Sequence, residues 1–249
     1  MATTKIEWAN KVWNPITGCS PISEGCQHCY AARMAKRLAG RYGYPAGDGF
    51  AVTLHPDKLD EPLKWKKPCR IFVCSMGDLF HDGNGCDDIK NIWDVMFDCP
   101  RHTFIILTKR PMNMKQFSLW MKQEGRRMDY PNIWLGVTAE NQARTDERIP
   151  ILLSIPAAKH FVSVEPMLSK VDLGGPLNGY PEQVSEGHWE QTYPPLDWVI
   201  AGPETGPGAR ECKPEWIKDL ADQCESAGVP FFEKRKNFIR REWPKSARS

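Results

Sequence analysis

The segment TFIILTKRPMNMKQFSLWMKQEG (103–125) joins a short apolar run to a stretch of helical period. An apolar, β-branched run of this length is typical of a strand buried on both faces, and the spacing of apolar residues after it indicates an amphipathic helix. The same order of strand and then helix returns along the chain, which predicts a parallel sheet. The fold class is therefore expected to be α/β.

Six other runs share this apolar character: FAVTLH (50–55), RIFVCS (70–75), IWLGVT (133–138), HFVSVE (160–165), WVIAGP (198–203) and PFFEK (230–234). Further helical patterns occupy 87–99, 141–154 and 213–228, and a glycine signal closes the last of them. This number of units favours a partial or full parallel β/α barrel over an open sheet, and no strand is followed by a dinucleotide-binding glycine fingerprint. Residues 166–195, rich in Gly and Pro, are interpreted as an insertion in a single domain spanning 1–249.

The composition is that of a chain with a full hydrophobic core. Of its 249 residues, 41% are hydrophobic and 26% are charged, and the formal net charge is +2. No signal run and no membrane-length apolar segment is evident, so we expect a cytoplasmic protein without a membrane partner. Nine cysteines, an odd number, are atypical of a secreted disulfide framework and indicate thiols kept reduced inside a cell.

Polar side chains follow five of the predicted strands. In parallel barrels the active site lies at the carboxyl ends of the strands, because the loops that follow them converge there. The side chains expected at this mouth are Asp78, His81, Lys109, Arg110, Glu140, Glu165, Glu204 and Arg210. So many charged strand ends favour a polar binding site over charges that only solvate the tips of loops.

Three cysteines lie close together in one loop: Cys19, Cys26 and Cys29. Thiolates are the usual ligands of iron–sulfur clusters, and three of them would leave one iron of a cubane cluster open for chemistry. Structural zinc instead requires a closed shell of four ligands, so a zinc site would have to recruit His28, Cys69 or Cys74. The cysteines outside the loop are interpreted mainly as small buried hydrophobes.

Ordered motifs carry a resemblance over nearly the whole chain. They are WNPITGCSPISEGCQHCYA, SMGDLFH, LTKRP, IWLGVT, FVSVEPML and VIAGPETGPGAR, with GVPFFEK after them. In this order they resemble the phage Gp37/Gp68-type family of radical SAM proteins. The resemblance implies a barrel of the radical SAM type and a [4Fe–4S] cluster held by Cys19, Cys26 and Cys29. It also implies an enzyme that cleaves S-adenosylmethionine to a 5′-deoxyadenosyl radical, which abstracts hydrogen from a substrate.

The resemblance further implies which residues contact S-adenosylmethionine. Residues 75–78 would lie at the methionine amino group, and Lys109 or Arg110 would pair with its carboxylate. The glutamates would bind ribose hydroxyls, order basic residues or touch substrate, while Tyr30 or His28 would pack on the adenine. The full expected set is Ser75, Met76, Gly77, Asp78, Lys109, Arg110, Glu140, Glu165, Glu204 and Tyr30. No catalytic side chain is assigned.

The substrate is indicated by the C-terminal run KRKNFIRREWPK (234–245), in which cations surround Phe238 and Trp243. This mixture is expected of a nucleic-acid contact, although such runs also occur as solvated tails. The phage resemblance implies a modified DNA base or nucleotide as substrate, a reductase or flavodoxin-type electron donor, and the host cytoplasm as location. The alternatives are a small-metabolite substrate, or a zinc-containing nucleic-acid-binding protein without catalysis.

Overall fold

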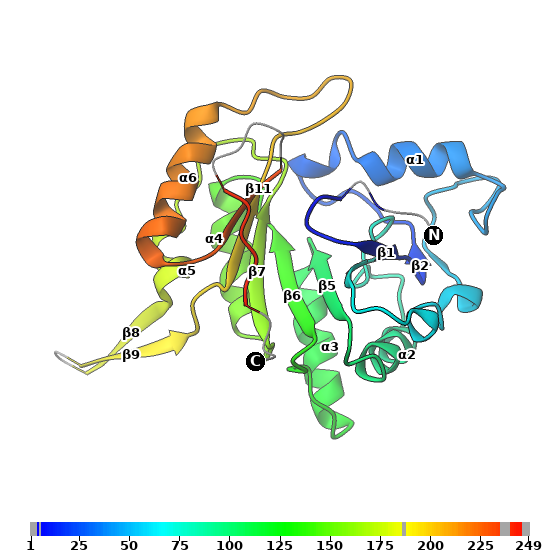
Figure 1. Ribbon diagram of the computed structural model, residues 1–249, viewed down its shortest axis with the longest axis horizontal. Coiled ribbons are helices and arrows are strands. Elements are labelled where there is room, and N and C mark those ends of the chain that lie inside the picture. Colours follow the sequence, from blue (N-terminus) through cyan, green and yellow to red (C-terminus); the bar gives the residue numbers. More distant parts are fainter. Residues whose placement is uncertain (1–3, 5, 186–187, 235–239, 246–249) are drawn as a thin grey trace.

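The centre of the molecule is a seven-stranded sheet curled into a half-barrel (Figure 1). The computed structural model describes residues 4, 6–185, 188–234 and 240–245. The strand order is β1-β4-β5-β6-β7-β10-β11, and every neighbouring pair runs parallel. The predicted α/β fold with a parallel sheet is confirmed, in the form of a partial barrel.

The strands are short and mostly apolar. Their bounds are β1 Lys11–Trp13, β4 Arg70–Val73, β5 Thr103–Thr108, β6 Ile133–Thr138, β7 Lys159–Val164, β10 Trp198–Ala201 and β11 Phe231–Glu233. Both β6 and β10 are buried along their whole length. This is the burial expected of parallel strands that are covered on both faces.

One strand prediction is wrong at the N-terminal edge. The run 50–55 contributes only β3 (Thr53–Leu54), which pairs antiparallel with β2 (Ile16–Thr17) in a separate small sheet. The edge position of the half-barrel belongs instead to β1, which pairs with β4. Leu54 is exposed, so the run is not the strand with two buried faces that its composition indicated. β1 was missed because three residues are too few to display a period.

All the helices but the first pack on the outer face of the sheet, where one large apolar cluster joins the two layers. The first helix packs instead in a small cluster with Tyr44 and Met76. The helices are α1 Tyr30–Leu38, α2 Cys86–Phe97, α3 Pro111–Gln123, α4 Gln142–Leu153, α5 Gly174–Asn178 and α6 Pro214–Ala227. α6 ends at Gly228 with φ of +68°, as the glycine signal predicted. Among the helices of the described residues, none combines the length and apolar character needed to cross a lipid bilayer.

The segment 166–195 holds α5 and a hairpin formed by β8 (Tyr180–Ser185) and β9 (His188–Tyr193). The hairpin projects away from the half-barrel (Figure 1). Since β7 pairs directly with β10, the segment does not interrupt the sheet.

Aromatic side chains fill the inner face of the half-barrel. Trp8, Trp134, Phe161, Trp198 and Phe232 form a buried cluster there. The indole of Trp198 donates to the carbonyl of residue 242 at 2.9 Å, so the end of the chain is bound to the sheet. Ile6 and Trp243 pack against the same cluster, so residues near both ends of the chain cover the inner face.

The described part of the basic C-terminal run, 240–245, is not a free tail. The Trp243 ring packs on Phe232 with the ring centroids 5.0 Å apart, and the Arg70 guanidinium lies 4.8 Å from the centroid of the indole. This packing takes Trp243 away from the stacking role expected of it. Phe238, the other predicted stacking residue, lies outside the described residues.

Candidate functional site

A cavity of about 280 Å³ opens at the carboxyl ends of the strands. The three clustered cysteines line it together with most of the other predicted residues, namely Ser75, Gly77, Asp78, Lys109, Arg110, Glu165, Glu204 and Tyr30. Four predicted residues do not line it, namely Met76, His81, Glu140 and Arg210. Met76 packs beneath α1, and Glu140 is fully buried behind the cysteine loop.

The cysteine loop (18–29) leaves β2 through a close contact between two glycines. The Gly18 amide donates to the Met76 carbonyl at 2.9 Å. Gly18 has φ of +90°, and a Cβ there would overlap the Ala51 carbonyl oxygen, so only glycine fits. A Cβ on Gly77 would likewise lie 2.8 Å from the Gly18 carbonyl oxygen. The Met76 carbonyl, expected at a cofactor amino group, therefore holds the start of the loop.

The three thiols are free and half-buried. An Arg110 Nη1 donates to Cys19 Sγ at 3.3 Å, and the Ser23 hydroxyl oxygen lies 3.8 Å from Cys26 Sγ. Within the part of the chain that the structure describes, no three His, Cys, Asp or Glu side chains converge on a point that would hold a single metal ion. The thiols thus form an open array around the cavity rather than a closed shell.

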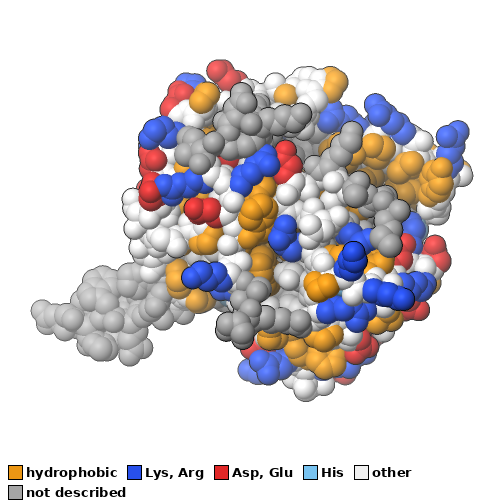
Figure 2. Space-filling model, in the orientation of Figure 1, with side chains coloured by type: hydrophobic (Ala, Val, Ile, Leu, Met, Phe, Trp, Pro, Cys, Tyr) orange, Lys and Arg blue, Asp and Glu red, His pale blue; other side chains and the backbone are white. Residues whose placement is uncertain are grey.

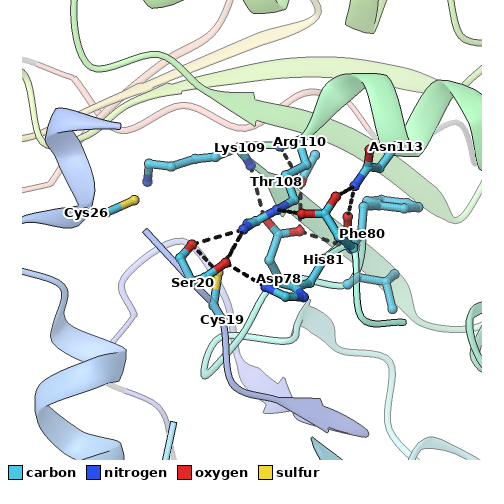
Figure 3. A network of polar contacts seen from close by, with 12 residues as sticks. Cys19, Ser20, Cys26, Asp78, Phe80, His81, Thr108, Lys109, Arg110 and Asn113 are labelled. Carbon is cyan, nitrogen blue, oxygen red and sulfur yellow. Dashed lines mark hydrogen bonds and ion pairs between the residues drawn. The ribbon is translucent and has the colours of Figure 1, made fainter. Parts of the chain in front are cut away.

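Cations lie near two of the thiols. Burial and the Asp78 carboxylate raise the pKa of Cys19, against the opposing charge of Arg110. Burial acts in the same direction on Cys26, but hydrogen bonds with the loop backbone and the Lys109 charge bring the pKa of Cys26 below its usual value. Figure 3 shows the Lys109 side chain extended toward Cys26. A neighbouring cation is the setting that favours a thiolate.

Asp78 is the centre of the polar network on the β4–β5 side (Figure 3). One carboxylate oxygen accepts from the Thr108 hydroxyl at 2.7 Å and from the Phe80 amide at 3.0 Å. The other accepts from the Lys109 amide at 3.2 Å and from the Arg110 guanidinium at 3.4 Å. Since both oxygens are engaged, Asp78 orients Arg110 and does not present a free carboxylate to a ligand.

Arg110 connects this network to the cysteine loop. It donates to the carbonyl and to the hydroxyl of Ser20, each at 3.0 Å, in addition to Cys19 Sγ. The Ser20 hydroxyl oxygen also lies 2.8 Å from His81 Nε2. The Arg110 side chain is only 5% exposed, so its two Nη groups donate to protein acceptors and not to water, while its buried Nε has no hydrogen-bond partner in the described residues.

Glu140 holds the loop from behind. Its carboxylate accepts from Arg148 at 2.9 Å, from the Gly25 amide at 3.2 Å and from the Ser23 hydroxyl. Burial alone would raise the pKa of Glu140. The Lys109 charge and the contacts with Ser23 and Arg148 outweigh burial and keep this pKa below its ordinary value. Glu140 therefore anchors the loop, in place of the cofactor contact expected of it.

Glu204 ties the loop to the segment that follows β10. Arg210 donates two hydrogen bonds to its carboxylate through the guanidinium, at 2.5 and 2.9 Å, which is a bidentate pair. His28 Nδ1 lies 3.0 Å from the same carboxylate. The hydrogen bonds from Arg210 lower the pKa of Glu204 to about 2. Arg210 also donates to the Glu24 carbonyl at 3.0 Å, so this pair holds the loop at two points.

The floor of the cavity contains a polar atom without a partner. The Ser163 hydroxyl is buried at the end of β7, and no group in the described residues bonds to it. A buried polar group left unpaired costs about 1–3 kcal/mol, so this hydroxyl would be stabilised by a polar ligand or a water molecule in the cavity. Glu165, two residues on, is already paired with Lys234.

Sequence reasoning missed Ser163, Ser20, Ser23 and Arg148. Ser163 had a usable signal, because it is a polar residue inside the otherwise apolar run HFVSVE. The two loop serines had only their position between the cysteines. Arg148 had none, since an arginine in an amphipathic helix is ordinarily a solvated residue.

The candidate fourth ligands of a zinc site lie in different environments. Cys69 precedes β4, at the end of the strand away from the cavity, and its thiol donates to the Lys67 carbonyl at 3.0 Å. Cys74 lines the cavity, but burial raises its pKa to about 12 and keeps the thiol protonated. His28 also lines the cavity, with its Nδ1 turned to Glu204.

Comparison with known proteins places the chain in a family. Neither the curated proteins nor the solved structures include a significant match. A family model described as "Protein of unknown function (DUF5131)" matches residues 3–246, which is nearly the whole chain. On that match, the chain belongs to the DUF5131 family.

Proposed function

We propose that this protein is a radical SAM enzyme, with a [4Fe–4S] cluster on Cys19, Cys26 and Cys29 and S-adenosylmethionine in the adjoining cavity. The observation that supports it most is the convergence of three free, half-buried thiols from one loop on a cavity at the carboxyl ends of a parallel half-barrel. The ordered motifs that resemble the Gp37/Gp68-type radical SAM family point the same way. When bound, the cluster and S-adenosylmethionine supply a 5′-deoxyadenosyl radical that abstracts hydrogen from substrate.

The donor set fits such a cluster. Three thiolates match a cubane with one open iron, and no fourth soft ligand that is ready to ionise lines the cavity within the described residues, because the pKa of Cys74 is raised to about 12 by its burial. Arg110 and Lys109 place positive charge beside the thiols, which offsets the negative charge of a thiolate-bound cluster. The unpaired Ser163 hydroxyl supports a polar ligand deeper in the cavity.

Two neighbouring cations have different proposed roles, one in holding the loop and one in binding the cofactor. Arg110 is committed to Asp78, Ser20 and Cys19. Lys109 lines the cavity and forms no ion pair at contact distance among the residues described, although its charge acts on Glu140. Lys109 is therefore the group proposed to hold the methionine carboxylate of S-adenosylmethionine, while Arg110 holds the loop.

The cavity walls would limit the access of water to the radical. Phe50, Phe72 and Leu107 line it with apolar surface below the polar rim. Exclusion of water from a closed site suppresses side reactions of reactive intermediates. An external reductase or flavodoxin-type protein is proposed to supply the electron.

Metal content tests the proposal. Protein reconstituted anaerobically with iron and sulfide should carry about four irons per chain and absorb in the visible range. Cys19→Ala, Cys26→Ala and Cys29→Ala should each lose this cluster, because two thiolates hold a cubane poorly. Cys86→Ala is the matched control, since it removes an exposed thiol at the start of α2 and should retain full iron.

A different metal would overturn this assignment. Colourless protein with one tightly bound zinc, lost in the His28→Gln variant, would establish the zinc-containing alternative. The role of Lys109 is tested separately by calorimetry with S-adenosylmethionine on cluster-loaded protein. Lys109→Gln should weaken binding roughly tenfold or more while the iron content stays unchanged, since a charge-assisted hydrogen bond contributes about 1.5–3 kcal/mol.

A further inference from the structure

The outer side of α1 and the turn after it carry cations that the proposed chemistry does not use. Between Glu24 and Asp48 the sequence has no acidic residue, but it has four basic ones. They are Arg33, Lys36, Arg37 and Arg41, here called the cationic stripe. The formal net charge of the whole chain is only +2, so the stripe is a local concentration of positive charge. Figure 2 shows Lys and Arg side chains along this edge of the molecule, over α1.

The stripe lacks the carboxylate partners that cations on two other helices have. On α2 and α6, lysines pair with aspartates one turn away, as in Lys90–Asp94 and Lys218–Asp222. No member of the stripe pairs with a carboxylate in the described residues. The helix dipole favours cations in the last turn of α1, but it does not account for Arg41, which lies beyond the helix.

The opposite face of α1 determines where the stripe points and where it begins. Ala31 and Ala35 are buried against Tyr44 and Met76, so the helical period turns the cations away from the core. Tyr30, the first residue of α1, lines the cavity and is 60% exposed. A helix of nine residues at 1.5 Å per residue carries the stripe roughly 13 Å outward from the cavity mouth.

An aromatic ring is held in the open beside the stripe. Tyr42 is 78% exposed and has φ of +54°, a left-handed conformation that is disfavoured for a residue with a Cβ. Such backbone strain persists where the surroundings enforce it, and it clusters at functional sites. Exposed aromatic rings among cations are the combination that binds single-stranded nucleic acids, because phosphates meet the charges and bases stack on the rings.

We propose that the cationic stripe and Tyr42 bind a single-stranded nucleic acid and lead one of its nucleotides to the cavity. The stripe offers charge for several successive phosphates, and its inner end meets the cavity at Tyr30. A base must leave its stack to enter a concave site, so single-stranded or unpaired DNA or RNA is favoured over duplex. This inference deepens the proposed function by naming the substrate class; the reaction rests on that function, whereas the binding does not.

Binding is measured on the cluster-free protein with a short fluorescein-labelled single-stranded DNA of mixed sequence. The affinity of the wild type should fall steeply with salt. The triple variant Lys36→Gln/Arg37→Gln/Arg41→Gln leaves the hydrogen bond from Arg33 to the Thr205 carbonyl intact. It should weaken binding and flatten the slope of log affinity against log salt by about two, because each neutralised phosphate of a single strand contributes about 0.7 to that slope.

The matched control is Lys64→Gln/Lys66→Gln/Lys67→Gln, which removes the same charge from an exposed segment before β4, at the other end of the strands. Its salt slope should equal that of the wild type. Tyr42→Ala should weaken binding about fivefold or more without changing the slope, because it removes stacking and no charge.

Three outcomes would overturn the inference. They are a wild-type protein without salt-sensitive binding to single-stranded DNA or RNA, an equal weakening of binding in the two triple variants, and preferential binding of phosphatidylserine vesicles through the stripe. Iron loading of the same proteins keeps the two proposals apart. Wild-type protein that binds DNA but never assembles a cluster contradicts the proposed function alone, and protein that assembles the cluster but binds no nucleic acid contradicts the stripe alone.

Discussion

The two ends of the cysteine loop are held by ion pairs of opposite orientation. At the Cys19 end, Arg110 faces the loop and Asp78 lies behind it. At the Gly25 end, Glu140 faces the loop and Arg148 lies behind it. The reason is local: the first end presents a sulfur and a carbonyl oxygen, which need donors, whereas the second presents an amide and a hydroxyl, which need an acceptor.

The opposite orientation of the two ion pairs indicates that the two ends of the loop have different roles. At the first end, the Arg110 guanidinium donates to the Cys19 thiol and lies beside it with its positive charge. Arg110 therefore influences the reactivity of Cys19 as well as the position of the loop. The carboxylate end, made by Glu140 and Glu204, contacts Gly25, Ser23 and His28 and touches no thiol among the described residues. The first end should therefore control reactivity, and the second should control the placement of the loop.

The largest effect is expected from Glu140→Ala. It leaves the Arg148 guanidinium buried without its partner, which should lower the free energy of unfolding by about 3–5 kcal/mol. Urea unfolding measures it. Arg144→Ala on the same helix is the control, because Arg144 pairs with exposed Glu24 and Glu147 and should cost at most about 1 kcal/mol. Equal losses of free energy of unfolding in the two variants would show that Glu140 is not the main anchor of the cysteine loop.

Arg110→Met should lower the free energy of unfolding by less than Glu140→Ala does, but it should selectively change the reactivity of Cys19. Loss of charged hydrogen bonds should cost about 1.5–3 kcal/mol. Because Arg110 lowers the pKa of Cys19 against burial and Asp78, its removal should also slow the alkylation of Cys19 by iodoacetamide in the cluster-free protein. Mass spectrometry of the alkylated peptides measures each thiol. Arg210→Met should leave the rate of Cys19 alkylation unchanged. If it slowed the alkylation as much as Arg110→Met does, reactivity would not be controlled by the Arg110 end alone.

The smallest effect is expected from Glu204→Gln, and it should depend on pH. The pKa of Glu204 is lowered to about 2 by Arg210, so the pair stabilises the fold fully above the unfolded-state pKa of this carboxyl, at 4.5. The contribution is lost as the pH falls from there toward 2. The difference in free energy of unfolding between wild type and variant, about 1 kcal/mol near neutral pH, should therefore shrink on acidification. A difference that stays constant down to about pH 3 would assign the effect to packing.

The sequence by itself determined the parallel α/β sheet, because the strand and helix periods are local properties of the chain. It also determined that three thiols share one loop and that charged residues follow the strands, since the ends of parallel strands meet at one edge. These local patterns were sufficient to collect most of the predicted residues around one cavity. They said nothing of β1, whose three residues show no period.

Only the tertiary structure decided what each charged residue does. The hydrogen bonds that assign the roles join residues far apart in sequence, 91 positions for Arg110 and Cys19 and 117 for Ser23 and Glu140. A pattern along the chain cannot say whether a carboxylate at a strand end faces the cavity, as Glu204 does, or backs the loop, as Glu140 does. Trp243 shows the same limit, because its ring is exposed or buried according to a contact with Phe232 that forms only when the half-barrel closes on the end of the chain.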